Sequence, residues 1–191
     1  MIETNNLRLV PCELAHFEAV LNDPKFLQRM LGVRLAERWL EFPESMQFGY
    51  EYLKASPDAL GWWTYLFIHA KDKALMGNGG FVGLPDESGK VEIGYSIAPA
   101  YRNRGLATEA AQGFVTYAFS KPQVKMVDAH TLSEISPSTR VLEKIGMTKI
   151  GTAHDPDEGE VWHWRVTRED FERGFKISVC FGSTASSESQ R

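Results

Sequence analysis

Residues 91–110 read VEIGYSIAPAYRNRGLATEA and pass from a strand through a polar loop into a helix. Apolar and polar residues alternate over 91–98, which is typical of a strand with one buried face. The loop ends at Gly105, and small and apolar residues then recur at helical spacing over 106–119. A helix start presents unpaired backbone N–H groups and the positive end of the helix dipole. The segment therefore predicts a site for an anion such as a phosphate group.

The side chains around this helix start favour the same interpretation. Gly105 has no side chain to block a ligand and Ala107 has almost none, while Arg102 and Arg104 add positive charge. Two common phosphate motifs are absent, since Leu106 follows Gly105 where a P-loop has lysine, and the glycine spacing of a dinucleotide fingerprint is missing. These residues indicate a phosphate-bearing ligand without identifying it. A tight connection with solvated arginines is the alternative.

Outward from this segment, strand and helix patterns mix along the chain. Strand patterns occupy residues 7–11, 63–68, 75–82, 91–98, 124–132, 147–153 and 161–167. Helical spacing occupies residues 13–21, 106–119 and 137–145, with two or three further helices over 26–54. For the helix at 137–145, Ser136 is a capping residue, Pro137 occupies the first position and Gly146 marks the end. The mixture predicts an α+β, or mixed α/β, fold.

Composition bounds the class of protein. The chain has 191 residues, 43% of them hydrophobic and 24% charged, which is ordinary for one globular domain. The net charge of -4 disfavours sequence-independent binding to nucleic acid. Two cysteines, Cys12 and Cys180, can form neither a disulfide framework nor a four-cysteine zinc site, so we expect a reducing compartment and no metal.

We expect a single domain over residues 1–175, followed by a flexible Ser-rich tail over 176–191. The first residues lack the basic and apolar regions of a signal peptide. No apolar run approaches the roughly 18 residues that a membrane span needs. We therefore expect a cytoplasmic protein with no membrane or nucleic-acid partner, either a monomer or a homodimer.

Residues 91–99 and 101–110 together resemble the acetyl-CoA signature of the GNAT superfamily of N-acetyltransferases. Its core pattern, Gln/Arg-x-x-Gly-x-Gly/Ala, is met by Arg102, Gly105 and Ala107. Four further stretches are similar to the RimJ/RimL-type branch, which acetylates protein N-termini among other amines. They are the flanking Glu-Ile-Gly-Tyr and Ala-Thr-Glu-Ala, LRL at 7–9 and STRVLEKIGM at 138–147. The resemblance implies a central, mostly antiparallel sheet of about seven strands, flanked by helices and splayed between its fourth and fifth strands.

The same resemblance implies acetyl-CoA as co-substrate, without a metal. Backbone groups of the loop and first helical turn would hold its pyrophosphate, namely Arg102, Asn103, Arg104, Gly105, Leu106, Ala107 and Thr108. Ile97 and Ala98, at the end of the splayed strand, would hydrogen-bond the pantetheine arm and the acetyl carbonyl. Such donors stabilise the oxyanion that develops when an amine attacks a thioester. Direct attack in a ternary complex needs no covalent enzyme intermediate.

Two residues are candidates for proton transfer. Alternation places Glu92 on the strand face opposite the apolar residues, and related enzymes often carry a base there; a glutamate that merely pairs with a cation is the alternative. Ser138 is the candidate for protonating the departing thiolate, the alternative being an ordinary serine in a first helical turn. His130, His154 and His163 are further candidate bases, for which we prefer a structural or solvated role.

Two departures from the related pattern leave other functions open. Ile135 stands where the branch usually has asparagine, and Leu142 where many members have a tyrosine acid. These departures motivate a non-catalytic acyl-CoA-binding module as an alternative to an enzyme. Among amine acceptors, deprotonation at pH 7 costs about 1 kcal/mol for a protein α-amine and about 4.6 kcal/mol for lysine, which favours a peptide N-terminus. A small-molecule amine such as a polyamine or aminoglycoside is the other alternative.

Overall fold

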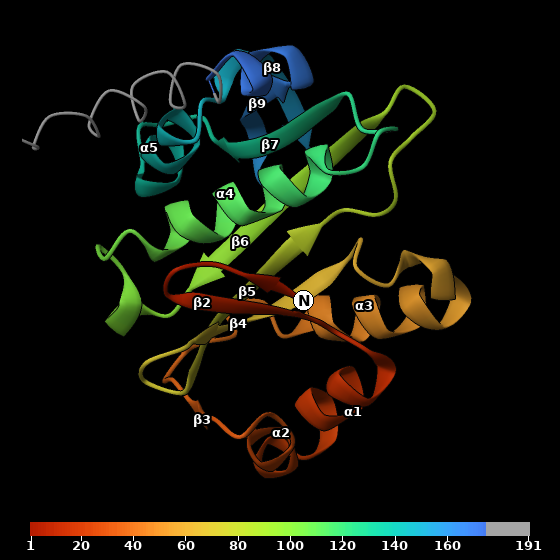
Figure 1. Ribbon diagram of the computed structural model, residues 1–191, viewed down its shortest axis with the longest axis vertical. Coiled ribbons are helices and arrows are strands. Elements are labelled where there is room, and N and C mark those ends of the chain that lie inside the picture. The colour runs from red at the N-terminus through yellow and green to blue at the C-terminus, as the bar shows by residue number, and fades with distance from the viewer. Residues whose placement is uncertain (175–191) are drawn as a thin grey trace, which may run out of the picture.

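The computed structural model describes residues 1–174 and, within them, forms one nine-stranded sheet flanked by helices (Figure 1). The tail predicted at 176–191 lies outside the described residues. The strands are β1 (Ile2–Glu3), β2 (Leu7–Pro11), β3 (Arg34–Leu35), β4 (Thr64–His69), β5 (Ala74–Phe81), β6 (Lys90–Ile97), β7 (Met126–Leu132), β8 (Thr148–Asp155) and β9 (Gly159–Thr167). The helices are α1 (Leu14–Asn22), α2 (Pro24–Leu31), α3 (Glu44–Ala55), α4 (Leu106–Phe119) and α5 (Pro137–Lys144), with short 3-10 turns at η1 (Pro57–Ala59) and η2 (Pro99–Tyr101).

The sheet is mixed and mostly antiparallel, as predicted. Its strand order is β1-β2-β4-β5-β6-β7-β9-β8, with β3 paired in parallel to β5. All seven predicted strands are present. The two additional strands, β1 and β3, have two residues each, too short to produce a periodic signal. No helix in the described part of the chain is long and apolar enough to cross a membrane.

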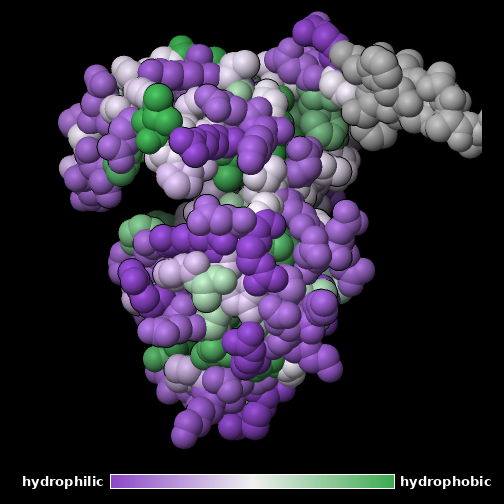
Figure 2. All heavy atoms as spheres, turned by 90° about the vertical axis from the view of Figure 1, so that its left-hand side faces the viewer, coloured by the Kyte–Doolittle hydropathy of each residue, from purple (hydrophilic) through white to green (hydrophobic). Residues whose placement is uncertain are grey.

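The predicted splay lies between β6 and β7. These strands pair in parallel over only three positions, from Lys90 with Met126 to Glu92 with Asp128. Beyond Glu92, β6 continues beside β5 as far as Ile97, while β7 continues beside β9. The two halves of the sheet therefore separate at this point. Figure 2 shows a notch with a mainly hydrophilic rim between the upper part of the molecule, which holds β7–β9 and α5, and the lower part.

Helix α4 covers the sheet beside β6 (Figure 1). Phe114 lies at the centre of its buried face, with its ring centroid 5.2 Å from that of Tyr65 and 5.4 Å from that of Phe81. Close approach of β5 to β6 needs glycine, because a Cβ at Gly79 would collide with the Gly94 carbonyl. This packing holds the end of β6 and the start of α4 in a defined relation.

Arg168, just after β9, ties the end of α4 to the following loop. Its guanidinium donates to the carbonyls of Phe119 at 2.8 Å, Lys121 at 2.7 Å and Val124 at 3.0 Å. The bond to Phe119 satisfies a carbonyl that a helix end otherwise leaves unpaired, and the other two hold the loop that follows. We expect Arg168→Ala to lower the free energy of unfolding by about 2 kcal/mol, measured by urea denaturation.

A surface arginine provides the control for this prediction. Arg173 pairs with Glu169 and Asp170, and its side chain is 63% exposed. Arg173→Ala should cost less than about 0.5 kcal/mol, because exposed ion pairs contribute little. Equal losses in the two variants would refute the role given to Arg168.

Candidate active site

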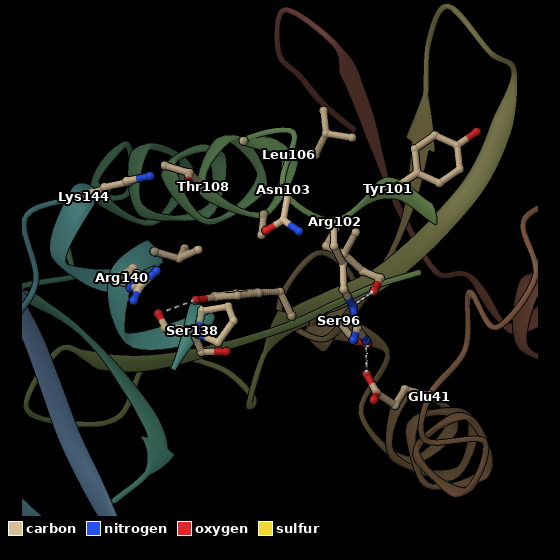
Figure 3. A pocket seen from close by; sticks show the side chains of 16 residues that line it. Glu41, Ser96, Tyr101, Arg102, Asn103, Leu106, Thr108, Ser138, Arg140 and Lys144 are labelled. Atoms are coloured by element: carbon tan, nitrogen blue, oxygen red, sulfur yellow. Dashed lines mark hydrogen bonds and ion pairs between the residues drawn. The ribbon is translucent and has the colours of Figure 1, made fainter. Parts of the chain in front are cut away.

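A cavity of about 620 Å³ lies between the end of β6, the start of α4 and one side of α5 (Figure 3). Tyr95 and Ile97 reach it from the buried face of β6, and Ser96 reaches it from the opposite face. Tyr95 spans the separation of the sheet halves, since its hydroxyl donates to the Ser138 carbonyl at 3.4 Å. The cavity is therefore built around the place where the sheet divides.

The start of α4 contributes unpaired backbone donors to this cavity. Within residues 1–174, the N–H groups of residues 103–108 have no hydrogen-bond partner, and the first bond of the helix runs from the Glu109 N–H to the Gly105 carbonyl at 3.0 Å. Gly105 (φ 76°) and Asn103 (φ 59°) are both left-handed, which bends the chain around these N–H groups. We call the N–H groups of residues 103–108 the amide cradle. Unpaired N–H groups at a helix start are the donors that an anion site requires.

The two loop arginines are placed differently. The Arg102 side chain lines the cavity, donating from Nε to the Ile97 carbonyl at 2.8 Å and from Nη2 to Glu41 Oε2 at 3.3 Å. The Arg104 side chain does not line it; its guanidinium lies over the Tyr101 ring and 3.9 Å from Asp72. Arg104 therefore contributes to the cradle through its backbone.

The remaining predicted cofactor residues lie at the end of β6. Ile97 lines the cavity, while its carbonyl already accepts from Arg102. Ala98 is fully buried and does not line the cavity, and its N–H donates to the Met76 carbonyl at 2.8 Å. In this arrangement the Ala98 amide belongs to the sheet, and a ligand would have to displace that bond to reach it.

Ser138 lies in the first turn of α5 and lines the cavity. The capping role belongs to Ser136, whose hydroxyl accepts from the Thr139 N–H. Among the described residues the Ser138 hydroxyl has no hydrogen-bond partner, so it can serve a ligand. Leu142, the position of the expected tyrosine acid, is instead buried in the core.

Three charged cavity residues were not identified from the sequence. Arg140 and Lys144 lie four residues apart on α5 and line the cavity, and this spacing on a predicted helix was the available signal. Glu41 comes from the loop before α3; its Oε2 accepts from Ser96 Oγ at 2.7 Å as well as from Arg102 (Figure 3). Nothing in the sequence around Glu41 indicates this contact, because its partners lie more than fifty residues away.

Glu92 does not line the cavity but belongs to a polar cluster on the same sheet face as Ser96. Glu92 Oε1 lies 2.8 Å from His130 Nδ1, and the His130 ring stacks on that of His163 at 4.6 Å. The series of contacts continues to Asp128, whose Oδ2 lies 2.6 Å from His163 Nε2. Arg165 in turn donates hydrogen bonds to both carboxylate oxygens of Asp128. We call these five side chains the histidine network. It joins β6, β7 and β9 where β6 and β7 begin to separate.

Asp128 anchors this network. Its side chain is only 2% exposed. Burial raises the pKa of its carboxyl, but the hydrogen bonds from Arg165 and His163 outweigh burial and hold the pKa below its ordinary value. Within residues 1–174, no group of three or more His, Cys, Asp or Glu side chains is placed to hold a metal ion.

A mixed, mostly antiparallel sheet that divides beside a cavity, with helices flanking it, is the architecture of this chain. Residues 6–148 match the model of the acetyltransferase (GNAT) domain, and the chain belongs to this family. It is an N-acetyltransferase.

Similar proteins agree with this assignment. The uncharacterized N-acetyltransferase YjdG of Bacillus subtilis (strain 168) is 28% identical over 148 residues, which cover 76% of this chain and 88% of YjdG. A spermidine N-acetyltransferase SpeG chimera from Vibrio cholerae superposes with a TM-score of 0.65 at 15% identity, covering 88% of this chain and 99% of that one. RimL, a ribosomal L7/L12 α-N-protein acetyltransferase solved with coenzyme A, gives a TM-score of 0.62 at 16% identity and covers 86% and 95%. At these identities the two structures support the shared fold alone.

Proposed function

We propose that this enzyme transfers an acetyl group from acetyl-CoA to a primary amine by direct attack in a ternary complex. The observation that carries the proposal is the amide cradle, whose N–H groups have no partner within residues 1–174 and whose residues, except Arg104, line the cavity. A pyrophosphate would satisfy these donors and the positive end of α4 together. The coenzyme A complex described for RimL supports the same ligand.

The cavity side chains extend the cradle. Arg140 and Lys144 supply cations from α5 for the phosphates of the ligand, opposite the amides of α4. When bound, acetyl-CoA supplies the activated thioester. Ile97 would orient its acyl end, joined by the Ala98 N–H if the ligand displaces the bond from that N–H to Met76, and the Ser138 hydroxyl would donate a proton toward the departing sulfur. Each of these roles is part of the proposal.

The acceptor would be an amine that arrives protonated. Glu92 places a carboxyl group on the sheet face opposite α4, which favours a cation there, whereas the Glu41 carboxyl is already paired with Arg102. We infer that Glu92, or the group hydrogen-bonded to it, accepts the ammonium proton. A protein N-terminus, as in the RimJ/RimL-type branch, is the preferred acceptor because its α-amine is deprotonated most easily.

One other acceptor has specific support. A polyamine is supported by the likeness to spermidine N-acetyltransferase, although only at the level of the fold. The non-catalytic acyl-CoA-binding module considered from the sequence is set aside, because the chain is an N-acetyltransferase. Acceptor preference separates the two enzymes.

An acceptor screen with thiol release as the readout tests the proposal. We expect release of CoA thiol from acetyl-CoA with peptides that have a free N-terminus, at least about 10-fold faster than with N-terminally blocked lysine peptides, because deprotonating lysine costs about 3.6 kcal/mol more at pH 7. Spermidine and an aminoglycoside complete the panel, and a reaction without acceptor gives the background. Binding of acetyl-CoA without thiol release with any of these amines would contradict the proposal.

A further inference from the structure

The histidine network arranges its members in order from a buried anchor to a half-exposed imidazole. Arg165 donates two hydrogen bonds, of 2.7 and 2.8 Å, to the buried Asp128 carboxylate. Asp128 fixes His163, and the His163 ring stacks on His130 with an interplanar angle of 22°. The His130 side chain is 30% exposed, so the final member of this series is accessible.

We propose that His130 Nε2 is the base that takes the proton from the acceptor ammonium, and that Glu92 is the carboxylate that orients it. This inference rests on the proposed function and assigns the proton transfer within it. An ionised carboxylate can only accept hydrogen bonds, so the contact to Glu92 holds the proton of a neutral ring on Nδ1. The lone pair is then on Nε2, which the described residues leave without a hydrogen-bond partner.

Imidazole suits this reaction better than a carboxylate. The reference pKa values are about 6.5 for an ordinary imidazole and about 4.3 for an ordinary glutamate, so an imidazole takes a proton about 100-fold more favourably. The efficiency of a general base is greatest when its affinity for protons is matched to the operating pH. A carboxylate that orients an imidazole forms a more capable pair than the carboxylate alone.

The position of His130 also fits the task. Pairing between β6 and β7 ends at Glu92 and Asp128, and His130 lies two residues further along β7, on the same face as Asp128. His130 and Glu92 therefore stand at the point where the two sheet halves separate. Ser96, on the same face of β6 as Glu92, lines the cavity, so the network and the cavity share this strand.

His163 is a positioning residue in this arrangement. Its Nε2 is already engaged by Asp128, and its ring restricts the rotation of His130 by stacking. The buried ion pair of Asp128 with Arg165 holds His163 in turn.

Protons and bonds are conserved in the proposed reaction. One ammonium proton moves to His130 Nε2, which leaves a neutral amine and an imidazolium. The amine nitrogen then forms a bond to the acetyl carbon, the carbon–sulfur bond breaks, and the second amine proton passes to the leaving sulfur through the Ser138 hydroxyl. The imidazolium finally releases its proton to water, so the net products are the acetylated amine, the free thiol and one proton.

Substitution of His130 by asparagine tests the proposal. Asparagine keeps an N–H donor for Glu92 but has no basic nitrogen. We expect His130→Asn to lower kcat about 100-fold or more with unchanged acetyl-CoA affinity, and to remove the acid limb of the kcat/KM pH profile. Imidazole in the buffer should restore turnover to His130→Ala, which a purely structural role would not predict. His154→Gln, which alters an exposed histidine outside the network, should leave kcat and the profile unchanged.

The pH profile must be interpreted with the groups around His130 in view. The charged and titratable side chains that face it are Glu92 of β6, Asp128 of β7, Asp155 of β8, and His163 and Arg165 of β9. In Glu92→Gln we expect the acid limb of the pH profile to remain but to move to lower pH, because the negative charge that stabilises an imidazolium is removed. An NMR spectrum of the imidazole nitrogens, independent of turnover, should show the neutral His130 ring protonated on Nδ1.

The outcomes separate this inference from the proposed function. If His130→Asn keeps the wild-type rate and the acid limb of the pH profile, the base is not His130. The same holds if Glu92→Gln removes the acid limb while His130→Asn only shifts it. A neutral ring protonated on Nε2 would equally overturn the assignment. If none of the amines tested causes the wild-type enzyme to release thiol above the background, the proposed function itself fails and this inference fails with it.

Discussion

Replacement of Gly105 by aspartate is expected to weaken acetyl-CoA binding by at least about 100-fold, which corresponds to about 2.7 kcal/mol. Gly105 lines the cavity at the centre of the amide cradle. A carboxylate there repels the pyrophosphate and competes with it for the free N–H groups, and each charge-assisted hydrogen bond lost costs about 1.5–3 kcal/mol. Calorimetric titration with acetyl-CoA and with CoA measures the loss.

Two variants separate this effect from backbone strain. Gly105 has φ 76°, a conformation that asparagine tolerates, so Gly105→Asn adds similar bulk without charge and should lose less affinity. Gly146 has φ 84° and equally open surroundings but lies outside the cavity, at the end of α5. Gly146→Asp should therefore leave affinity within about 2-fold, which is less than about 0.5 kcal/mol. Full affinity in Gly105→Asp would remove the amide cradle from the site.

The largest loss of stability is expected from Asp128→Ala. This substitution leaves Arg165 and His163 without their common partner inside the sheet. Breaking a buried ion pair costs about 3–5 kcal/mol, and we expect about 3 kcal/mol because Arg165 is 29% exposed and can regain some hydration. Urea denaturation measures the change. Asp128→Asn, which retains one acceptor oxygen, should lose about half as much.

The pH dependence of this loss has a definite sign. The pKa of the Asp128 carboxyl is lower in the folded protein than in the unfolded chain, where it is about 3.9. Its contribution is therefore fully present above about pH 4 and is lost as the pH falls through the folded-state pKa. The difference between wild type and Asp128→Ala should be largest near pH 7 and should shrink below about pH 4. A difference of equal size at pH 7 and pH 3 would contradict the assignment, and the exposed Glu169→Ala serves as a control with little effect at either pH.

Several elements were predictable because their signals are local. The helix predicted at 106–119 has the observed limits of α4, and the helix predicted at 137–145 differs from α5 by one residue. Ser136 caps α5 as expected, since a cap requires only residues within one turn. The amide cradle was predictable for the same reason: it is built from consecutive backbone groups in a single loop and helix start.

The side-chain partners were not predictable, because they depend on sheet register and on loop packing. Glu92 could be placed on a strand face from alternation, yet its contact with His130 joins residues 38 positions apart across the β6–β7 junction. The structural or solvated role preferred for His130 from the sequence took no account of these contacts, because they are not visible in the sequence. Glu41 likewise reaches Ser96 only through the path of the loop before α3. Local chain chemistry thus specifies the helices, most strands and the loop that forms the amide cradle. The contacts of the histidine network depend instead on the approach of distant strands, because no short-range pattern records which residues the sheet brings together.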